Sequence, residues 1–177
     1  MDTFDHLLHW KLKRGSHYFP GPDGGTCINE AAVVAAGFPY KPICFVWQMP
    51  SCFSRPICRL AMRLNDQVGD ENRQRLLPYV TQLACADTRA IEKKRAAYIA
   101  QHLRGYGKHD IPFEKGLEVL EGALAIGQRA DPFPSDEVKT RMEEARTTPK
   151  PPVPISAQPF FAKVKSWLTT KEMEPLA

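Results

Sequence analysis

Cys27 is the side chain of this 177-residue chain best placed to do chemistry, because a thiol at a helix N-terminus can act as a nucleophile. The run GGTC at 24–27 precedes small apolar residues, so the sequence places Cys27 in the first turn of a helix. The unpaired N–H groups of that turn would lower the pKa of its thiol. His17 is the candidate general base, and Glu30 or Asp66 would orient its imidazole. With these roles the chain would be a thiol hydrolase or transferase.

Zinc binding is a second interpretation of the same region. Cys27 and Glu30 lie three residues apart on one helix face, while His17 and Cys52 come from two irregular loops. Together they would supply a tetrahedral Cys/His/Cys/Glu ligand set, which suits a structural zinc ion. The chain has neither a C-x2-C pair nor an H-x3-H pair, the spacings most typical of zinc sites. Zinc therefore stays an alternative.

Packing in the hydrophobic core is a third interpretation of Cys27, and it requires no chemistry. Free cysteine is among the most buried residue types and suits an alanine-rich helix. Cys44, Cys58 and Cys85 also lie among apolar residues, and we expect them to be buried. Five cysteines without regular spacing favour free thiols in a reducing compartment over a disulfide framework.

Helical periodicity of the apolar residues predicts the elements that position these side chains. We expect one all-α domain over residues 1–146, in which two long irregular loops, at 15–26 and 37–55, converge on the start of the Cys27 helix. The predicted helices span 2–14, 27–36, 56–68, a stretch from 70 to 83 kinked or offset at Pro78, 88–105, 113–130 and 135–146.

Three local expectations concern the second loop and the helix that follows it. Residues 43–47 are apolar and could form a short extended segment. Arg55 precedes Pro56, which disfavours a helical conformation, so we expect a surface arginine in the loop. Asn65 and Asp66 belong to types that favour helix ends, which indicates a capping turn more than a polar pair directed toward Cys27.

The C-terminal part of the chain differs in composition from the rest. Five of the thirteen residues at 147–159 are prolines, which favours an extended linker. Residues 160–170 then predict a short amphipathic helix, too short to be stable alone. We expect this helix to dock on its own domain, on a partner protein or on a second copy of the chain. Its apolar stripe consists of Phe160, Phe161, Val164, Trp167 and Leu168.

Charge and hydropathy limit the classes of partner. A net charge of +4 with 25% charged residues implies no dense phosphate-binding surface, so nucleic acid is not indicated. The longest apolar stretches, at 31–37 and 43–47, fall far short of the roughly 18–20 residues of a membrane span. The sequence begins MDTFD, without the basic residues of a signal peptide, which predicts a cytoplasmic protein.

Five short motifs stand out along the first half of the chain: GSH at 15–17, GGTCINE at 24–30, PSC at 50–52, LND at 64–66 and RQRLLPY at 73–79. Together they resemble the pattern of a family of small uncharacterised bacterial and phage proteins. The resemblance covers residues 7–99, and the family has no established activity that carries over. It implies that the motif positions form a shared site: His17, Cys27, Glu30, Cys52 and the pair Asn65-Asp66.

The ordinary charge, the absence of a catalytic signature and the amphipathic C-terminal segment together favour a non-enzymatic protein-binding module. A regulator or inhibitor of a larger bacterial or phage-defence machine would fit this description. The alternatives are the structural-zinc domain and the thiol enzyme with Cys27 as its nucleophile.

Overall fold

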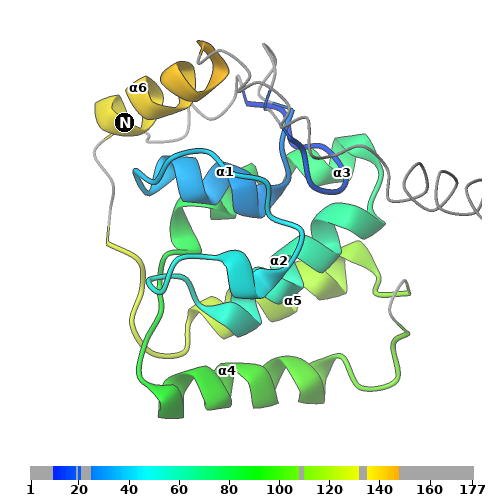
Figure 1. The fold of residues 1–177 in the computed structure, drawn as a ribbon. Helices are drawn as coiled ribbons and strands as arrows, with labels where there is room; N and C mark the ends of the chain where they lie inside the picture. Colours follow the sequence, from blue (N-terminus) through cyan, green and yellow to red (C-terminus); the bar gives the residue numbers. More distant parts are fainter. Residues whose placement is uncertain (1–9, 19, 21–24, 108–109, 132–134, 148–177) are drawn as a thin grey trace, which may run out of the picture.

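The computed structural model describes residues 10–18, 20, 25–107, 110–131 and 135–147 (Figure 1). Helices dominate these ranges, and the described residues contain no sheet, only an isolated parallel bridge between Leu12 and Thr26. The predicted all-α fold is therefore confirmed for the described part. Its elements are α1 (Ile28–Ala35), η2 (Val46–Gln48), α2 (Arg55–Gln67), α3 (Asp70–Gln74), η3 (Leu77–Gln82), α4 (Arg89–His102), α5 (Phe113–Leu124) and α6 (Ser135–Thr147).

Helix α1 lies at the centre of the domain. It packs against α6 on one side and against α2 and η3 on the others (Figure 1). All eight of its residues are buried, the polar Asn29 and Glu30 included. The structure confirms the predicted helix to within one residue at each end. Cys27, however, is the N-cap residue and not part of the first turn.

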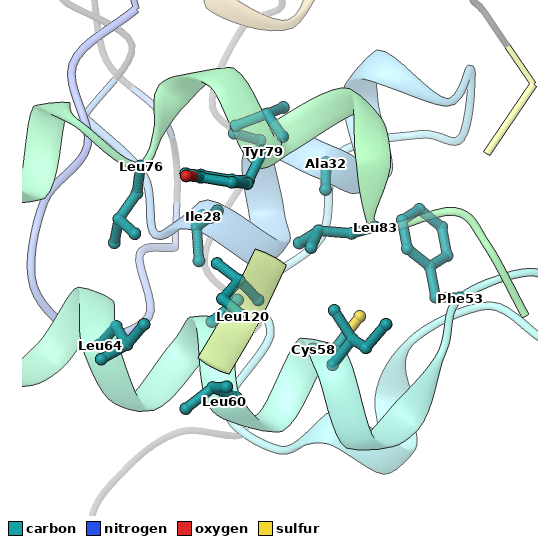
Figure 2. Close-up of a cluster of buried hydrophobic side chains, with 14 of the residues drawn as sticks. Ile28, Ala32, Phe53, Cys58, Leu60, Leu64, Leu76, Tyr79, Leu83 and Leu120 are labelled. Carbon is teal, nitrogen blue, oxygen red and sulfur yellow. The ribbon is translucent and has the colours of Figure 1, made fainter. Parts of the chain in front are cut away.

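The hydrophobic core forms where α1, α2, η3 and α5 meet. Figure 2 shows side chains from these elements gathered in one cluster. Each such side chain, fully buried, stabilises the fold by roughly 1.5–3 kcal/mol. The side chains labelled in Figure 2 are Ile28, Ala32, Phe53, Cys58, Leu60, Leu64, Leu76, Tyr79, Leu83 and Leu120.

Two glycines allow α5 to pack closely against its neighbours. A Cβ atom at Gly116 would collide with the side chain of Leu64 on α2, and one at Gly122 would collide with Tyr98 on α4. Glycine costs a helix about 1 kcal/mol relative to alanine. Close contact between helices explains why glycine occupies these two positions despite that cost.

A buried arginine joins α4 to the segments on either side of it. Arg95 is fully buried, and its guanidinium donates hydrogen bonds to the carbonyl oxygens of Cys85, Ile126 and Gln128 at 2.6–2.8 Å. It also forms an ion pair with Glu92 at 2.7 Å. These bonds satisfy the buried charge, which would otherwise be costly.

The predictions near the two ends of the chain have different outcomes. The helix expected over 2–14 is wrong for residues 10–14, because Lys13 N–H donates to the carbonyl of Thr26 and the segment runs extended beside it. The remainder of that prediction lies outside the described residues. The linker at 148–159 and the helix at 160–170 also lie outside them, whereas α6 confirms the prediction for 135–146.

The middle of the chain brings further differences. Arg55 is the first residue of α2, so the expected loop arginine is wrong; Pro56 occupies a position where a helix needs no N–H donor. The stretch from 70 to 83 divides into α3 and η3, which agrees with an interruption at Pro78. Residues 43–47 form no regular extended segment, because the 3-10 turn η2 begins at Val46.

Candidate functional site

Glu30 is a buried carboxylate that gathers two loops onto the start of α1. Its Oε1 accepts hydrogen bonds from Ser16 Oγ at 2.7 Å and from His17 N–H at 2.9 Å. The same oxygen accepts one from the N–H of Ile43 at 3.0 Å, while Oε2 accepts one from the N–H of Cys27 at 3.0 Å. These five residues are named the Glu30 cluster below. Such a set of donors stabilises a carboxylate in a site that excludes water.

Asn65 and Asp66 fasten the first loop from the other side. Asn65 Oδ1 accepts from the N–H of Ile28 at 3.3 Å, and its Nδ2 donates to the carbonyl of Lys13 at 2.9 Å. Asp66 Oδ1 accepts from the N–H of Gly15 at 2.9 Å. The pair thus lies in α2 and reaches toward the Cys27 region. The expected capping turn is wrong, because the helix continues past both residues to Gln67.

The Cys27 thiol stays protonated in this surrounding. Cys27 is 1% exposed, and its burial raises the pKa of the thiol well above the usual range. The neighbouring carboxylate of Glu30 raises this pKa further, against weaker effects of backbone hydrogen bonds from residues 29 and 30. The predicted lowering of this pKa is therefore wrong. Burial outweighs the helix terminus, since the Cys27 side chain is enclosed.

The imidazole of His17 lies next to the carboxylate of Glu30, as the thiol-enzyme hypothesis requires for an oriented general base. Its Nδ1 is 3.4 Å from Glu30 Oε2, and its side chain is 24% exposed. The carbonyl of His17 accepts a hydrogen bond of 2.6 Å from the hydroxyl of Tyr40. Burial, and then the charge of Glu30, raises the pKa of Tyr40, so this hydroxyl keeps its proton and continues to donate. The backbone and the ring of His17 are both held in place.

The four residues proposed as zinc ligands do not assemble into a ligand set. Cys52 is exposed on the second loop, whereas Cys27 and Glu30 are buried. Both oxygens of Glu30 already accept hydrogen bonds. Among the residues that the structure describes, no group of three or more His, Cys, Asp or Glu side chains could hold a metal ion.

The other cysteines divide into buried and exposed. Cys58 and Cys85 are buried as predicted, with pKa values raised mainly by that burial. Cys44 is exposed, so its predicted burial is wrong. Its place in an apolar run suggested packing, but only Ile43 and Val46 of that run turn inward.

Residues 41–48, named the aromatic loop, present two large aromatic side chains to solvent. Phe45 is 58% exposed and Trp47 is 72% exposed, the two highest values among the large hydrophobic residues described. Their rings stack on each other, with centroids 5.8 Å apart and planes within 9° of parallel. No motif in the sequence identifies this pair. Ile43 and Val46 turn inward three residues apart, which leaves Cys44, Phe45 and Trp47 on the outside.

Hydrogen bonds hold the aromatic loop in one conformation. Gln48 Oε1 accepts from the N–H groups of Cys44 at 2.8 Å and Phe45 at 2.9 Å. Lys41 Nζ donates to the carbonyl of Gln48 at 2.7 Å, and Arg55 donates to the carbonyl of Val46 at 2.5 Å. The hydrogen bond from the N–H of Ile43 to the carboxylate of Glu30 attaches the aromatic loop to α1. The aromatic pair is therefore displayed by a rigid turn.

Comparisons with protein-family models, curated proteins and solved structures found no match to this chain. The resemblance to a bacterial and phage family stays a prediction from the five motifs. Within the described ranges, every helix is too short or too polar to cross a membrane. The residues expected to bind a partner in the C-terminal segment, 160–168, lie outside the described part.

Proposed function

We propose that this protein is a binding module that docks a partner protein through Phe45 and Trp47. The observation that carries the proposal is the exposure of this stacked pair on a loop fixed by hydrogen bonds. Aromatic side chains dominate the binding energy of protein interfaces, with tryptophan and tyrosine most enriched. A rigid display lowers the entropy lost on binding.

A further exposed aromatic side chain precedes the aromatic loop in the chain. Phe38 is 40% exposed and contacts Phe53, with ring centroids 6.3 Å apart. Because Phe53 is 1% exposed, this contact joins Phe38 to the core. An exposed aromatic surface on a firm base is typical of an interaction site.

The hypothesis of thiol catalysis receives less support from the same structure. A nucleophilic cysteine must be accessible and must release its proton near neutral pH. Cys27 is enclosed and has a raised pKa. The residues around it hold the loops in place, which indicates a structural role for the Glu30 cluster.

Site-specific photo-crosslinking tests the proposal. The photoreactive amino acid p-benzoylphenylalanine replaces Trp47 in the full chain, which is expressed in its native host cells. Tyr106, which is 40% exposed and lies outside the aromatic loop, is replaced in a matched control. We expect a discrete adduct with another protein from position 47, lost when Phe45→Ala is added, and no such adduct from position 106.

Three results would contradict the proposal. They are the absence of an adduct at position 47, the same adducts from both positions, or an adduct formed only between two copies of this chain. The last result would assign the surface to self-association.

A further inference from the structure

The aromatic loop belongs to a long segment that carries only positive charge. Residues 31–65 include no Asp or Glu, and their four basic side chains are Lys41, Arg55, Arg59 and Arg63. The two acids that bound the segment turn inward. Glu30 is buried in its cluster, and Asp66 accepts a hydrogen bond from the backbone of the first loop.

Several of these cations lie at the aromatic pair. Arg55 donates to the carbonyl of Val46, between the two aromatic residues, and Lys41 donates to Gln48 at the end of the same turn. Arg59 is exposed one helical turn after Arg55 on α2, which packs against η2. The surface therefore combines exposed aromatic rings with a positive border.

An acid on the neighbouring helix α4 is already engaged. Glu92 of α4 accepts a hydrogen bond from Ser54 Oγ at 2.7 Å, just before Arg55 in the chain. Its other oxygen accepts from Arg95 at 2.7 Å and from the N–H of Asp87 at 3.1 Å. The charge of Glu92 is thus paired with Arg95 and does not neutralise the cations around the aromatic loop.

We propose that this surface binds a short acidic segment of a partner protein that also carries an apolar side chain. The apolar side chain would pack on Phe45 and Trp47, and the carboxylates would face Lys41, Arg55 and Arg59. Complementary charge of this kind speeds association and excludes wrong partners. The inference rests on the proposed function, and names the chemistry of its partner.

Charge favours an acidic segment of a partner protein over two other occupants of this surface, a second copy of the chain and the chain's own apolar stripe at 160–168. In a symmetric contact between two copies, the same cations would face each other, and like charges repel. The apolar stripe at 160–168 itself carries Lys163 and Lys165 and no acid; the acids Glu172 and Glu174 lie beyond it, next to Lys171. Nucleic acid is also acidic, and the test below treats it as an opposing outcome.

Selection from a random peptide library tests the inference directly. Peptides are selected on the full-length protein and counter-selected on the Trp47→Ala/Arg59→Glu variant, so that only binders of this surface remain. We expect enrichment of Asp and Glu together with at least one large apolar residue. The best peptide is then titrated by fluorescence anisotropy, with its charge-reversed and apolar-to-serine versions as comparisons.

The titrations give the expected magnitudes. Trp47→Ala and Arg59→Glu should each weaken binding at least about tenfold, as hot-spot residues do. Arg104→Glu makes the same charge change after α4, outside the 31–65 segment, and should change affinity by less than about twofold. Raising NaCl from about 0.05 to about 0.5 M should weaken binding to the wild type more than to Arg59→Glu. Circular dichroism confirms that each variant is folded.

Three results overturn the inference. The selected peptides are not enriched in Asp and Glu, or the charge-reversed peptide binds as tightly as the selected one. The third is a single-stranded oligonucleotide that displaces the peptide and binds with higher affinity. Equal loss of affinity in Arg59→Glu and Arg104→Glu would also overturn it, since it would show an unspecific charge effect. Failure of the proposed function is distinguishable, because crosslinking at position 47 is independent of the peptide's charge. A crosslinked partner with no acidic selection leaves the binding function standing and removes only this inference.

Discussion

The carboxylate of Glu30 accepts a hydrogen bond from the N–H of Ile43 at 3.0 Å, across thirteen residues of chain. This bond links the buried polar cluster at the start of α1 to the loop that exposes Phe45 and Trp47. Glu30 also holds the backbone of His17, so one side chain positions both irregular loops. The residues with the strongest chemical signature in the sequence thus hold the loop that exposes Phe45 and Trp47.

Glu30→Gln should lower the free energy of unfolding. A glutamine presents one acceptor oxygen and an NH2 group, so at least one of the donors around Glu30 loses its partner. An unpaired buried donor costs about 1–3 kcal/mol. Urea denaturation followed by circular dichroism measures this loss.

Glu118→Gln is the matched control for this change. Glu118 is 63% exposed and pairs only with Lys115 among the ion pairs described. We expect a change below about 0.5 kcal/mol. Equal effects of the two substitutions would show that the Glu30 cluster does not hold the loops.

Asn65→Ala should destabilise the protein by about 1–3 kcal/mol, because it leaves the N–H of Ile28 and the carbonyl of Lys13 without their partner. Asn65→Asp keeps the acceptor but loses the donor and adds a charge beside Asp66, so it should not restore stability. Asn72→Ala, at an exposed position of α3, is the control. An unchanged urea midpoint in Asn65→Ala would contradict the role given to Asn65.

The helices were largely predictable from the sequence, because their apolar spacing repeats over several turns. Thr88 caps α4, and its Oγ1 accepts from the N–H of Ile91. The extended run at 10–14 was not predictable from apolar spacing, since Leu12 is fixed by pairing with Thr26, a contact between distant residues.

The candidate site was predictable only in part. His17 and Cys27 both contact Glu30, whereas Cys52, another of the motif positions, is exposed on the second loop. Their chemistry depends on burial, which raises the pKa of Cys27, and burial arises from packing that local sequence does not encode. The aromatic pair escaped prediction for a similar reason: the exposure of Phe45 and Trp47 depends on side-chain-to-backbone bonds, which leave no spacing pattern.

Thiol labelling should separate the five cysteines into two classes. Cys44 and Cys52 are exposed, so two thiols should react with Ellman's reagent in the folded protein. Cys27, Cys58 and Cys85 are buried and should react only after denaturation. The double variant Cys44→Ser/Cys52→Ser should show no fast phase. A fast phase that remains there and disappears with Cys27→Ser would revive the thiol-enzyme hypothesis.

Stability should fall at alkaline pH through the buried thiols. Burial raises the pKa of Cys85 to about 11, whereas an unfolded cysteine titrates near about 8.5. The unfolded state therefore releases its proton first, so this contribution is complete below about pH 8.5 and is lost as pH rises toward 11. Between about pH 8.5 and 11, Cys85→Ala should reduce the slope of the unfolding free energy against pH by up to about 1.4 kcal/mol per pH unit. Urea denaturation under reducing conditions measures both slopes, and parallel curves would contradict the assignment.

Trp47→Ala should leave the fold nearly as stable as the wild type, although it removes the largest side chain of the aromatic loop. Trp47 is 72% exposed, so its loss forfeits only the stacking on Phe45, worth about 0.5–1.5 kcal/mol. Phe53→Ala removes an aromatic ring that is 1% exposed and should cost about 3–5 kcal/mol. Urea denaturation of both variants decides whether the pair serves stability. If Trp47→Ala costs as much as Phe53→Ala, the pair belongs to the core; a small cost shows that the pair is not needed for stability.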